Sequence, residues 1–121
     1  MSENHVYAAG NIFFAGKPIE MSLYAELYKR MKSELPPFEL RVQKTQITFV
    51  NPKVFACVSL KWKGCITITF GLPVRVDSSR IHQAAKIRPY RWTNHVKVSH
   101  PDEIDAELMK WLSEAYAFAS H

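Results

Sequence analysis

Residues 40–72 constrain the fold of this chain more than any other stretch. They are rich in valine, isoleucine, threonine and phenylalanine, and the pattern breaks only at Asn51-Pro52 and at Lys63-Gly64. β-Branched and aromatic residues bounded by turn-forming residues are typical of consecutive antiparallel strands. The sequence therefore predicts three strands, at about residues 40–50, 54–62 and 66–70.

The first of these strands changes phase in its middle. Leu40 and Val42 share one face, whereas Ile47 and Phe49 fall in the opposite phase. A β-bulge inserts one residue and re-aims the side chains that follow it. We therefore expect a bulge at residues 43–46.

The second and third strands can match their apolar faces only across a loop of odd length. Placing Trp62 opposite Ile66 satisfies this condition and leaves a three-residue turn. The same register places Cys57 near Gly71 and far from Cys65. We therefore expect no disulfide, with Cys57 buried in its strand and Cys65 exposed in the turn.

A helix is expected on each side of this strand region. Pro18 suits the first turn of a helix, apolar residues follow at three- and four-residue steps to Leu35, and Pro36-Pro37 ends the pattern. A second apolar stripe runs from Ile104 to Ala119, and Ser99 is the expected N-cap of that helix.

Residues 74–93 are the least regular part of the chain. A short helical turn is expected at about residues 79–86, and the alternation at residues 95–98 predicts a short further strand. The resulting fold class is α+β. We expect a single domain over residues 1–121, with an antiparallel sheet of about four to five strands and the N- and C-terminal helices packed on one face.

Charge is distributed unevenly along the chain. Residues 41–97 hold 11 lysines and arginines and a single acid, Asp77, so they carry a formal +10, whereas the flanking residues carry −5. Such asymmetry favours an anionic partner for the middle of the chain. The alternative is that acidic helices balance a basic sheet within one fold.

The sequence predicts a soluble cytoplasmic protein. The first residues lack the apolar run of a signal peptide, and no stretch approaches the roughly 20 apolar residues that cross a bilayer. Two cysteines are too few for a disulfide framework. We expect reduced thiols and no association with a membrane.

No motif for catalysis, metal or cofactor binding is present. There is no G-x-S-x-G, no H-E-x-x-H, no cysteine pair at metal-binding spacing and no glycine-rich phosphate loop among four glycines. The five histidines are scattered, and the acids near residue 105 suit the first turn of a helix. We therefore assign no catalytic residue, no metal ligand and no cofactor.

The strongest functional signal is a set of basic residues interleaved with aromatic ones. Arginine guanidinium groups grip phosphates, and aromatic rings stack on bases or other rings. The candidate ligand-binding residues are Lys44, Arg88, Tyr90, Arg91, Trp92 and His95. They predict a non-enzymatic module that binds an anionic ligand, either nucleic acid or a phosphorylated small molecule.

Three other interpretations remain open. Tyr90 and Trp92 could simply cover an edge of the core while the arginines sit in water. The chain could be a protein-interaction module or a homodimer that pairs through an edge strand at residues 95–98. It could also be an enzyme with a pocket around Lys44 and His95.

Several short motifs together resemble one protein family. They are F-A-G-K-P at residues 14–18, Q-K-T-Q-I at 43–47, F-A at 55–56, R-W-x-x-H-V-x-V at 91–98 and I-D-x-E-L-x-x-W-L-x-x-A-Y at 104–116. In this order they resemble the uncharacterised, mainly bacterial family catalogued as domain of unknown function 5655. The resemblance spans nearly the whole chain. It implies a small cytoplasmic α+β domain and brings no assigned activity.

Overall fold

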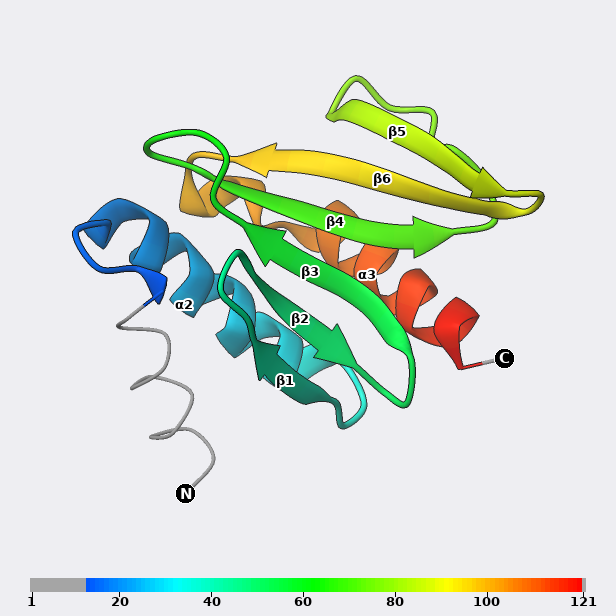
Figure 1. Cartoon of the computed structure of the whole chain (residues 1–121), viewed down its shortest axis with the longest axis horizontal. Helices are drawn as coiled ribbons and strands as arrows, with labels where there is room; N and C mark the ends of the chain where they lie inside the picture. The colour runs from blue at the N-terminus through cyan, green and yellow to red at the C-terminus, as the bar shows by residue number, and fades with distance from the viewer. Residues whose placement is uncertain (1–12, 121) are drawn as a thin grey trace.

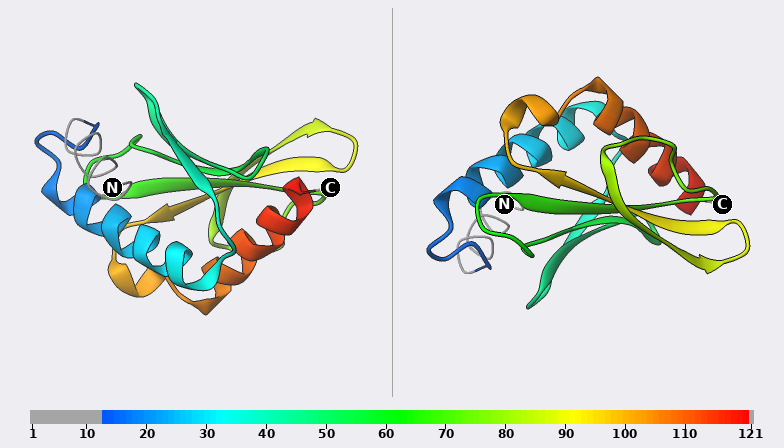
Figure 2. Two further views of the ribbon diagram at one scale, coloured as in Figure 1. Left: turned by 90° about the horizontal axis from the view of Figure 1, so that it is seen from below. Right: turned by 90° about the horizontal axis from the view of Figure 1, so that it is seen from above.

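A computed structural model describes residues 13–120, which form one antiparallel sheet of six strands with two long helices on one of its faces (Figure 1). Figure 2 shows both helices on the same side of the sheet. In chain order the elements are α2 (Pro18–Glu34), β1 (Glu39–Val42), β2 (Gln46–Val50), β3 (Val54–Ser59), β4 (Ile66–Leu72), β5 (Ile81–Arg88), β6 (Arg91–Val98), the short 3-10 helix η1 (Pro101–Glu103) and α3 (Ala106–Ala119). The α+β class and the placement of the helices are as the sequence predicts.

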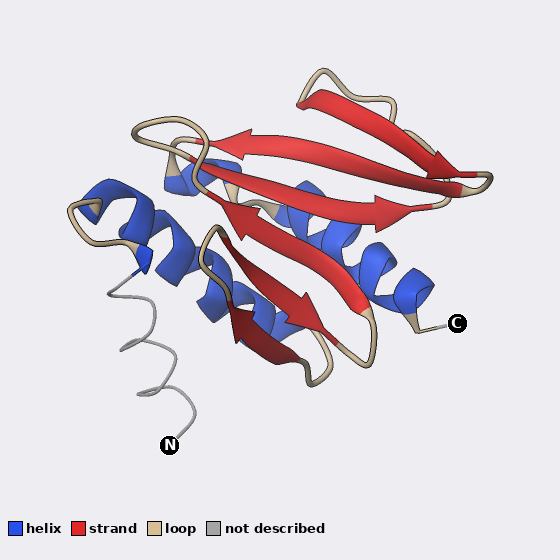
Figure 3. Cartoon of the chain, viewed as in Figure 1, coloured by secondary structure: helices blue, strands red, loops and turns tan. Residues whose placement is uncertain are grey.

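The strands lie in the order β1-β2-β3-β4-β6-β5. Figure 3 shows the sheet in the same view as the labelled Figure 1, with β6 between β4 and β5. β6 contains residues 95–98, which were expected to form a sheet edge. That expectation is wrong, because β4 and β5 pair with β6 on its two sides. The edges of the sheet are β1 and β5.

The expected bulge at residues 43–46 is instead a hairpin turn. β1 and β2 are separate strands, with Val42 opposite Ile47, and the Gln43 amide donates to the carbonyl of Gln46 over 2.8 Å. A turn also explains the phase change, since it places Leu40 opposite Phe49 and so puts both side chains on one face.

β3 and β4 match their apolar faces as expected, but in a different register. Val58 lies opposite Ile68, and Cys57 lies opposite Thr69 rather than Gly71. The connecting loop is also longer than three residues, because β3 ends at Ser59 and β4 begins at Ile66. It curls so that the Cys65 thiol lies 3.5 Å from the Trp62 carbonyl, which buries Cys65 while Cys57 remains half-buried. Both cysteines are free thiols.

Residues 81–98 form a long hairpin instead of a helical turn and a short strand. β5 and β6 pair along their length, with Arg88 opposite Arg91 across the turn at Pro89-Tyr90. Tyr90 has a φ of 62°, the left-handed conformation that a type II turn requires at the residue after its proline. This hairpin, together with the split of the first strand, raises the strand number from the expected four to five to six.

The core fills the space between the helices and the sheet. α2 buries Leu23, Leu27 and Met31, and its bounds agree with the expected helix. α3 buries Leu108 and Leu112 against the sheet. Burial of such side chains contributes about 1.5–3 kcal/mol each relative to leaving them exposed.

α3 begins later than the expected start at Ser99. Pro101 to Glu103 form the separate turn η1, and the Asp105 carboxylate accepts a hydrogen bond from the Leu108 amide over 3.0 Å. Asp105 is therefore the N-cap of α3. The carboxylate of Glu103 instead accepts hydrogen bonds from the amides of Ser99 and His100, which fixes the turn that precedes the helix.

Arg80 ties the connection before β5 to the start of α3. Its guanidinium donates to the Asp105 and Glu107 carboxylates and to the Glu103 carbonyl, and it lies 5.5 Å from the centre of the Trp111 ring. Arg80, one of the basic residues in the middle of the chain, therefore forms ion pairs within the fold.

Candidate functional site

One face of the sheet carries no helix among residues 13–120, and we call it the open face (Figure 2). Successive side chains of a strand point to opposite faces of the sheet. Residues that alternate with core residues along a strand therefore point to the open face. A single row of directly opposed residues crosses all six strands on the open face. It consists of Arg41, Thr48, Cys57, Thr69, His95 and Gln83.

A second row lies nearer the β3–β4 loop. It consists of Gln46, Ser59, Thr67 and Lys97. The loop bends over the end of this row, because the Lys97 amine lies 4.4 Å from the centre of the Trp62 ring. Thr67 is completely buried even though its strand position points away from the helices.

A hollow of about 400 Å³ opens where these rows meet the loop. Cys57, Thr69 and His95 line it from three neighbouring strands, and Gln46 and Lys61 line it from the strand end and the loop. Hydroxyl, thiol, amide, imidazole and ammonium groups therefore converge on one space. We call this space the His95 hollow.

Thr69 connects the other two strand residues of the His95 hollow. Its hydroxyl shares a hydrogen bond of 2.9 Å with His95 Nδ1. Burial raises the pKa of the Cys57 thiol, and a hydrogen bond with Thr69 and the charge of Lys61 oppose this rise only in part. The thiol is therefore protonated at neutral pH.

Both histidines of the open face are held neutral. Burial lowers the pKa of His95 and the positive charge of Lys61 lowers it further, with a smaller contribution from His82. Burial, Lys97 and Lys61 likewise lower the pKa of His82. The rings form a continuous group, with His82 5.3 Å from Trp62 and 6.3 Å from His95.

The open face is predominantly basic. Strand alternation places Arg41, Arg91 and Lys97 on it, with Glu39 at the corner of β1. The acids near the start of α3 lie on the other side of the sheet, where Arg80 binds two of them. A face of one sign of charge attracts ligands of the opposite sign.

The six candidate residues from the sequence do not form one site. Lys44 lies in the β1–β2 turn, whereas Arg88 and Tyr90 lie at the β5–β6 turn, and Figure 1 shows these turns at opposite ends and opposite edges of the sheet. Trp92 pairs with Leu72 and points to the helix side. His95 and Arg91 share the open face, and only His95 lines the hollow.

His95 is the one candidate from the sequence that lines the hollow, and the pattern did not single out its other lining residues, among them Cys57, Lys61 and Thr69. Thr67 and Thr69 alternate with buried isoleucines, which does place them on the face away from the core. Their nearness to His95 depends on β6 lying beside β4, and no local pattern encodes that pairing.

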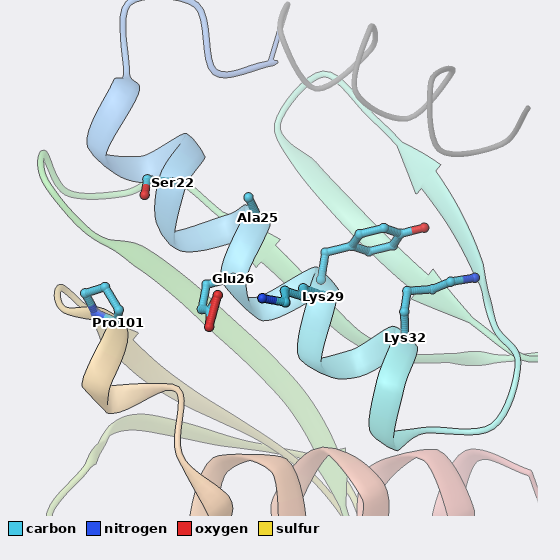
Figure 4. A pocket seen from close by; sticks show the side chains of 7 residues that line it. Ser22, Ala25, Glu26, Lys29, Lys32 and Pro101 are labelled. Atoms are coloured by element: carbon cyan, nitrogen blue, oxygen red, sulfur yellow. The ribbon is translucent and has the colours of Figure 1, made fainter.

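A larger hollow, of about 670 Å³, lies elsewhere, on the outer side of α2. In Figure 4, Lys29 turns toward Glu26, and Lys32 points away from both. The lining comes from one helix and Pro101, it carries charges of both signs, and its side chains do not converge. This hollow does not resemble a binding site.

Within the part of the chain that the structure describes, no three histidine, cysteine, aspartate or glutamate side chains are grouped so that they could hold a metal ion. His5 and His121 lie outside the described residues. None of the helices described is both long enough and apolar enough to cross a membrane.

Comparison with known proteins gives one result. No curated protein and no solved structure matches this chain. The family model described as Domain of unknown function (DUF5655) matches residues 12–119. The match covers most of the chain and agrees with the motifs in residues 14–116, so the chain belongs to the DUF5655 family.

Proposed function

We propose that this protein is a non-enzymatic binding module whose open face takes a phosphate-bearing ligand, with the phosphate in the His95 hollow. The observation that carries the proposal is the convergence of the hydrogen-bonded pair Thr69–His95 with the Lys61 ammonium in one hollow of about 400 Å³. A cation and neutral donors aimed at one space are what an anion requires.

The roles of the candidate residues change accordingly. His95 stays in the site, and Arg91 supplies charge on the same face. Lys61, rather than Lys44, supplies the ammonium group of this site. The aromatic surface comes from Trp62 and His82, since Trp92 points to the helix side of the sheet.

Binding requires no chemical step at this site. The raised pKa of Cys57 keeps its thiol protonated, and a protonated thiol is a poor nucleophile. We place the module in the cytoplasm of a bacterial cell, on the basis of the family resemblance and of two cysteines that remain free, as they do in reducing compartments.

The first test uses a short fluorescent oligothymidylate, followed by anisotropy at low salt, with a nucleoside monophosphate and inorganic phosphate as competitors. We expect the double variant Lys61→Ala/His95→Gln to weaken binding about tenfold or more, since a hydrogen bond to a charged group contributes about 1.5–3 kcal/mol. Binding should also weaken steeply with salt. Competition by the small phosphates separates a small-molecule site from a nucleic-acid site.

The matched control is Lys29→Ala, which removes the same charge from the hollow on α2. It should leave the affinity unchanged. Equal losses in Lys29→Ala and in the double variant would mean that net charge alone attracts the probe. If no phosphate probe binds, the proposal fails.

Affinity should also rise as the pH falls from neutrality toward 5. Both histidines are neutral at pH 7 because their pKa values are lowered, and an anion favours the imidazolium form. Phosphodiesters keep one charge over this range, so a change in oligothymidylate affinity reports on the protein. Titration of His95→Gln should show a weaker pH dependence, and an unchanged profile would argue against His95 as a ligand.

The edge strand β5 favours a second candidate function, homodimerisation. β5 pairs with β6 on one side only, and Ile87 on it is 58% exposed. Two copies could join β5 to β5 and extend the sheet. Light scattering at high protein concentration decides the matter, and a strict monomer would exclude this alternative.

A further inference from the structure

Another cavity lies between the start of α2 and the β3–β4 loop, and we call it the Trp62 cavity. It has about 530 Å³, within the range of about 300–1,000 Å³ that small-molecule sites occupy. The helix start and the loop lie side by side in Figure 1 and in both views of Figure 2. The residues that matter for its chemistry are Lys17, Ile19, Leu60, Lys61, Trp62 and Lys63.

The two walls of the cavity are joined by Glu20. This glutamate is only 4% exposed, and its carboxylate accepts a hydrogen bond of 2.9 Å from the Gly64 amide. The same hydrogen bond lowers the pKa of Glu20, so the carboxylate stays ionised. Gly64 has a φ of +81°, which a residue with a side chain adopts only with strain. This hydrogen bond holds the loop against the helix, and it pairs the Glu20 carboxylate with the Gly64 amide.

One side of the cavity is apolar and exposed. Ile19 is 58% exposed and Trp62 is 42% exposed, while Leu60 forms a half-buried surface beside them. The Trp62 ring has two close neighbours, with the Lys97 ammonium 4.4 Å and the centre of the His82 ring 5.3 Å from its centre. An indole packed between two neighbours, in a cavity that an exposed isoleucine also lines, offers a surface for a flat ring.

The rim of the cavity is cationic. Lys17, Lys61 and Lys63 contribute three ammonium groups from both walls, against the single carboxylate of Glu20. The lining thus has a net charge of +2, and its one acid, Glu20, is hydrogen-bonded to the loop backbone. Apolar and cationic groups together match a ligand that is apolar at one end and anionic at the other.

We propose that the Trp62 cavity binds a small amphiphilic anion, a flat apolar ring that carries a phosphate or carboxylate group. The ring lies against Trp62 and Ile19, and the anionic group lies among Lys17, Lys61 and Lys63. This site lies beside the His95 hollow and does not require His95, although the function proposed for that hollow also uses Lys61 and Trp62. The two spaces share only Leu60 and Lys61.

The experiment titrates the protein with naphthyl phosphate and follows the amide NMR signals, with naphthol and inorganic phosphate as parallel probes. We expect the signals of Gly16, Ile19 and Gly64 to move with naphthyl phosphate. Naphthol and inorganic phosphate should each bind at least about tenfold more weakly, since each lacks one half of the contact. If inorganic phosphate binds as tightly as naphthyl phosphate, the apolar half of the proposal is wrong.

Variants separate the two sites. Lys17→Ala/Lys63→Ala should raise the dissociation constant for naphthyl phosphate about tenfold, Ile19→Ser should raise it several-fold, and His95→Gln should leave it unchanged. All of these positions except His95 are exposed, so the fold is retained. Shifts confined to Thr69 and His95, an effect of His95→Gln alone, or no shift with any probe would overturn the inference.

Discussion

Replacing Asn94 with aspartate is expected to destabilise the protein by about 3–5 kcal/mol at pH 7, the range found when a buried charge is left without compensation. Asn94 lies in β6, is fully buried on the helix side and holds the connection between β4 and β5. Its side-chain oxygen accepts from the Val76 amide over 2.9 Å, and its side-chain nitrogen donates to the Val74 carbonyl over 3.2 Å. Asn94→Asp keeps the first hydrogen bond but sets a carboxylate oxygen against the Val74 carbonyl.

The pH dependence of this variant distinguishes charge from a simple packing defect. A buried carboxylate facing a carbonyl has its pKa raised above the ordinary value of about 3.9. The folded variant therefore takes up a proton at higher pH than the unfolded chain, and its stability deficit shrinks as the pH falls toward 4. Urea denaturation at a series of pH values measures this. A deficit that stays constant from pH 7 to 4 would contradict the argument.

Gln83→Glu is the matched control, because it makes the same change from amide to carboxyl at an exposed position of β5. It should alter the free energy of unfolding by no more than about 0.5 kcal/mol, as exposed substitutions usually do. A similar loss in both variants would mean that β5 and β6 tolerate added negative charge poorly wherever it is placed.

The spacing of apolar residues correctly predicted those parts of the fold that local spacing alone determines. The first helix is right because Pro18 and Pro36 bound a stripe of apolar residues at helical spacing. The matched faces of β3 and β4 are right because alternation alone decides them. Their register is wrong by two residues, since alternation is satisfied by every odd loop and the curl at Trp62 decides the actual length.

β5 shows where local pattern fails. Its sequence alternates poorly, because it is an edge strand with irregular pairing after Ile81 and after Lys86, and most of its side chains are exposed or half-buried. A strand of this kind has no buried face to impose a period of two. The pairing with β6 stabilises it, and that pairing becomes visible only once β6 is placed.

The candidate site illustrates the same limit. Trp92 and His95 are three positions apart, so any single strand places them on opposite faces, and this was readable from the sequence. The grouping of Thr69 with His95 was not. It requires β6 to lie next to β4 although residues 73–90, including all of β5, lie between them in the chain. The order of strands in a sheet is set by packing on the helices rather than by local propensity.

Truncating Phe49 to alanine is expected to cost about 3–5 kcal/mol, the usual range for a buried aromatic side chain. Phe49 is completely buried in β2, and its ring lies 5.7 Å from Phe38 and 6.3 Å from Phe55, which in turn lies 5.0 Å from Tyr116 of α3. The loss would therefore leave a cavity between the β1–β2 edge and α3.

A chain of this length has a total stability of about 5–15 kcal/mol, so the Phe49→Ala variant should unfold at a much lower urea concentration, with a midpoint lowered by more than about 1 M. Tyr90→Ala is the control, since it removes an aromatic ring that is 80% exposed, and it should shift the midpoint little. If Phe49→Ala costs less than about 1 kcal/mol, the β1–β2 hairpin does not unfold together with the core. Gln46 of this hairpin lines the His95 hollow. In that case, the β1–β2 side of the hollow would unfold more readily than the rest of the sheet.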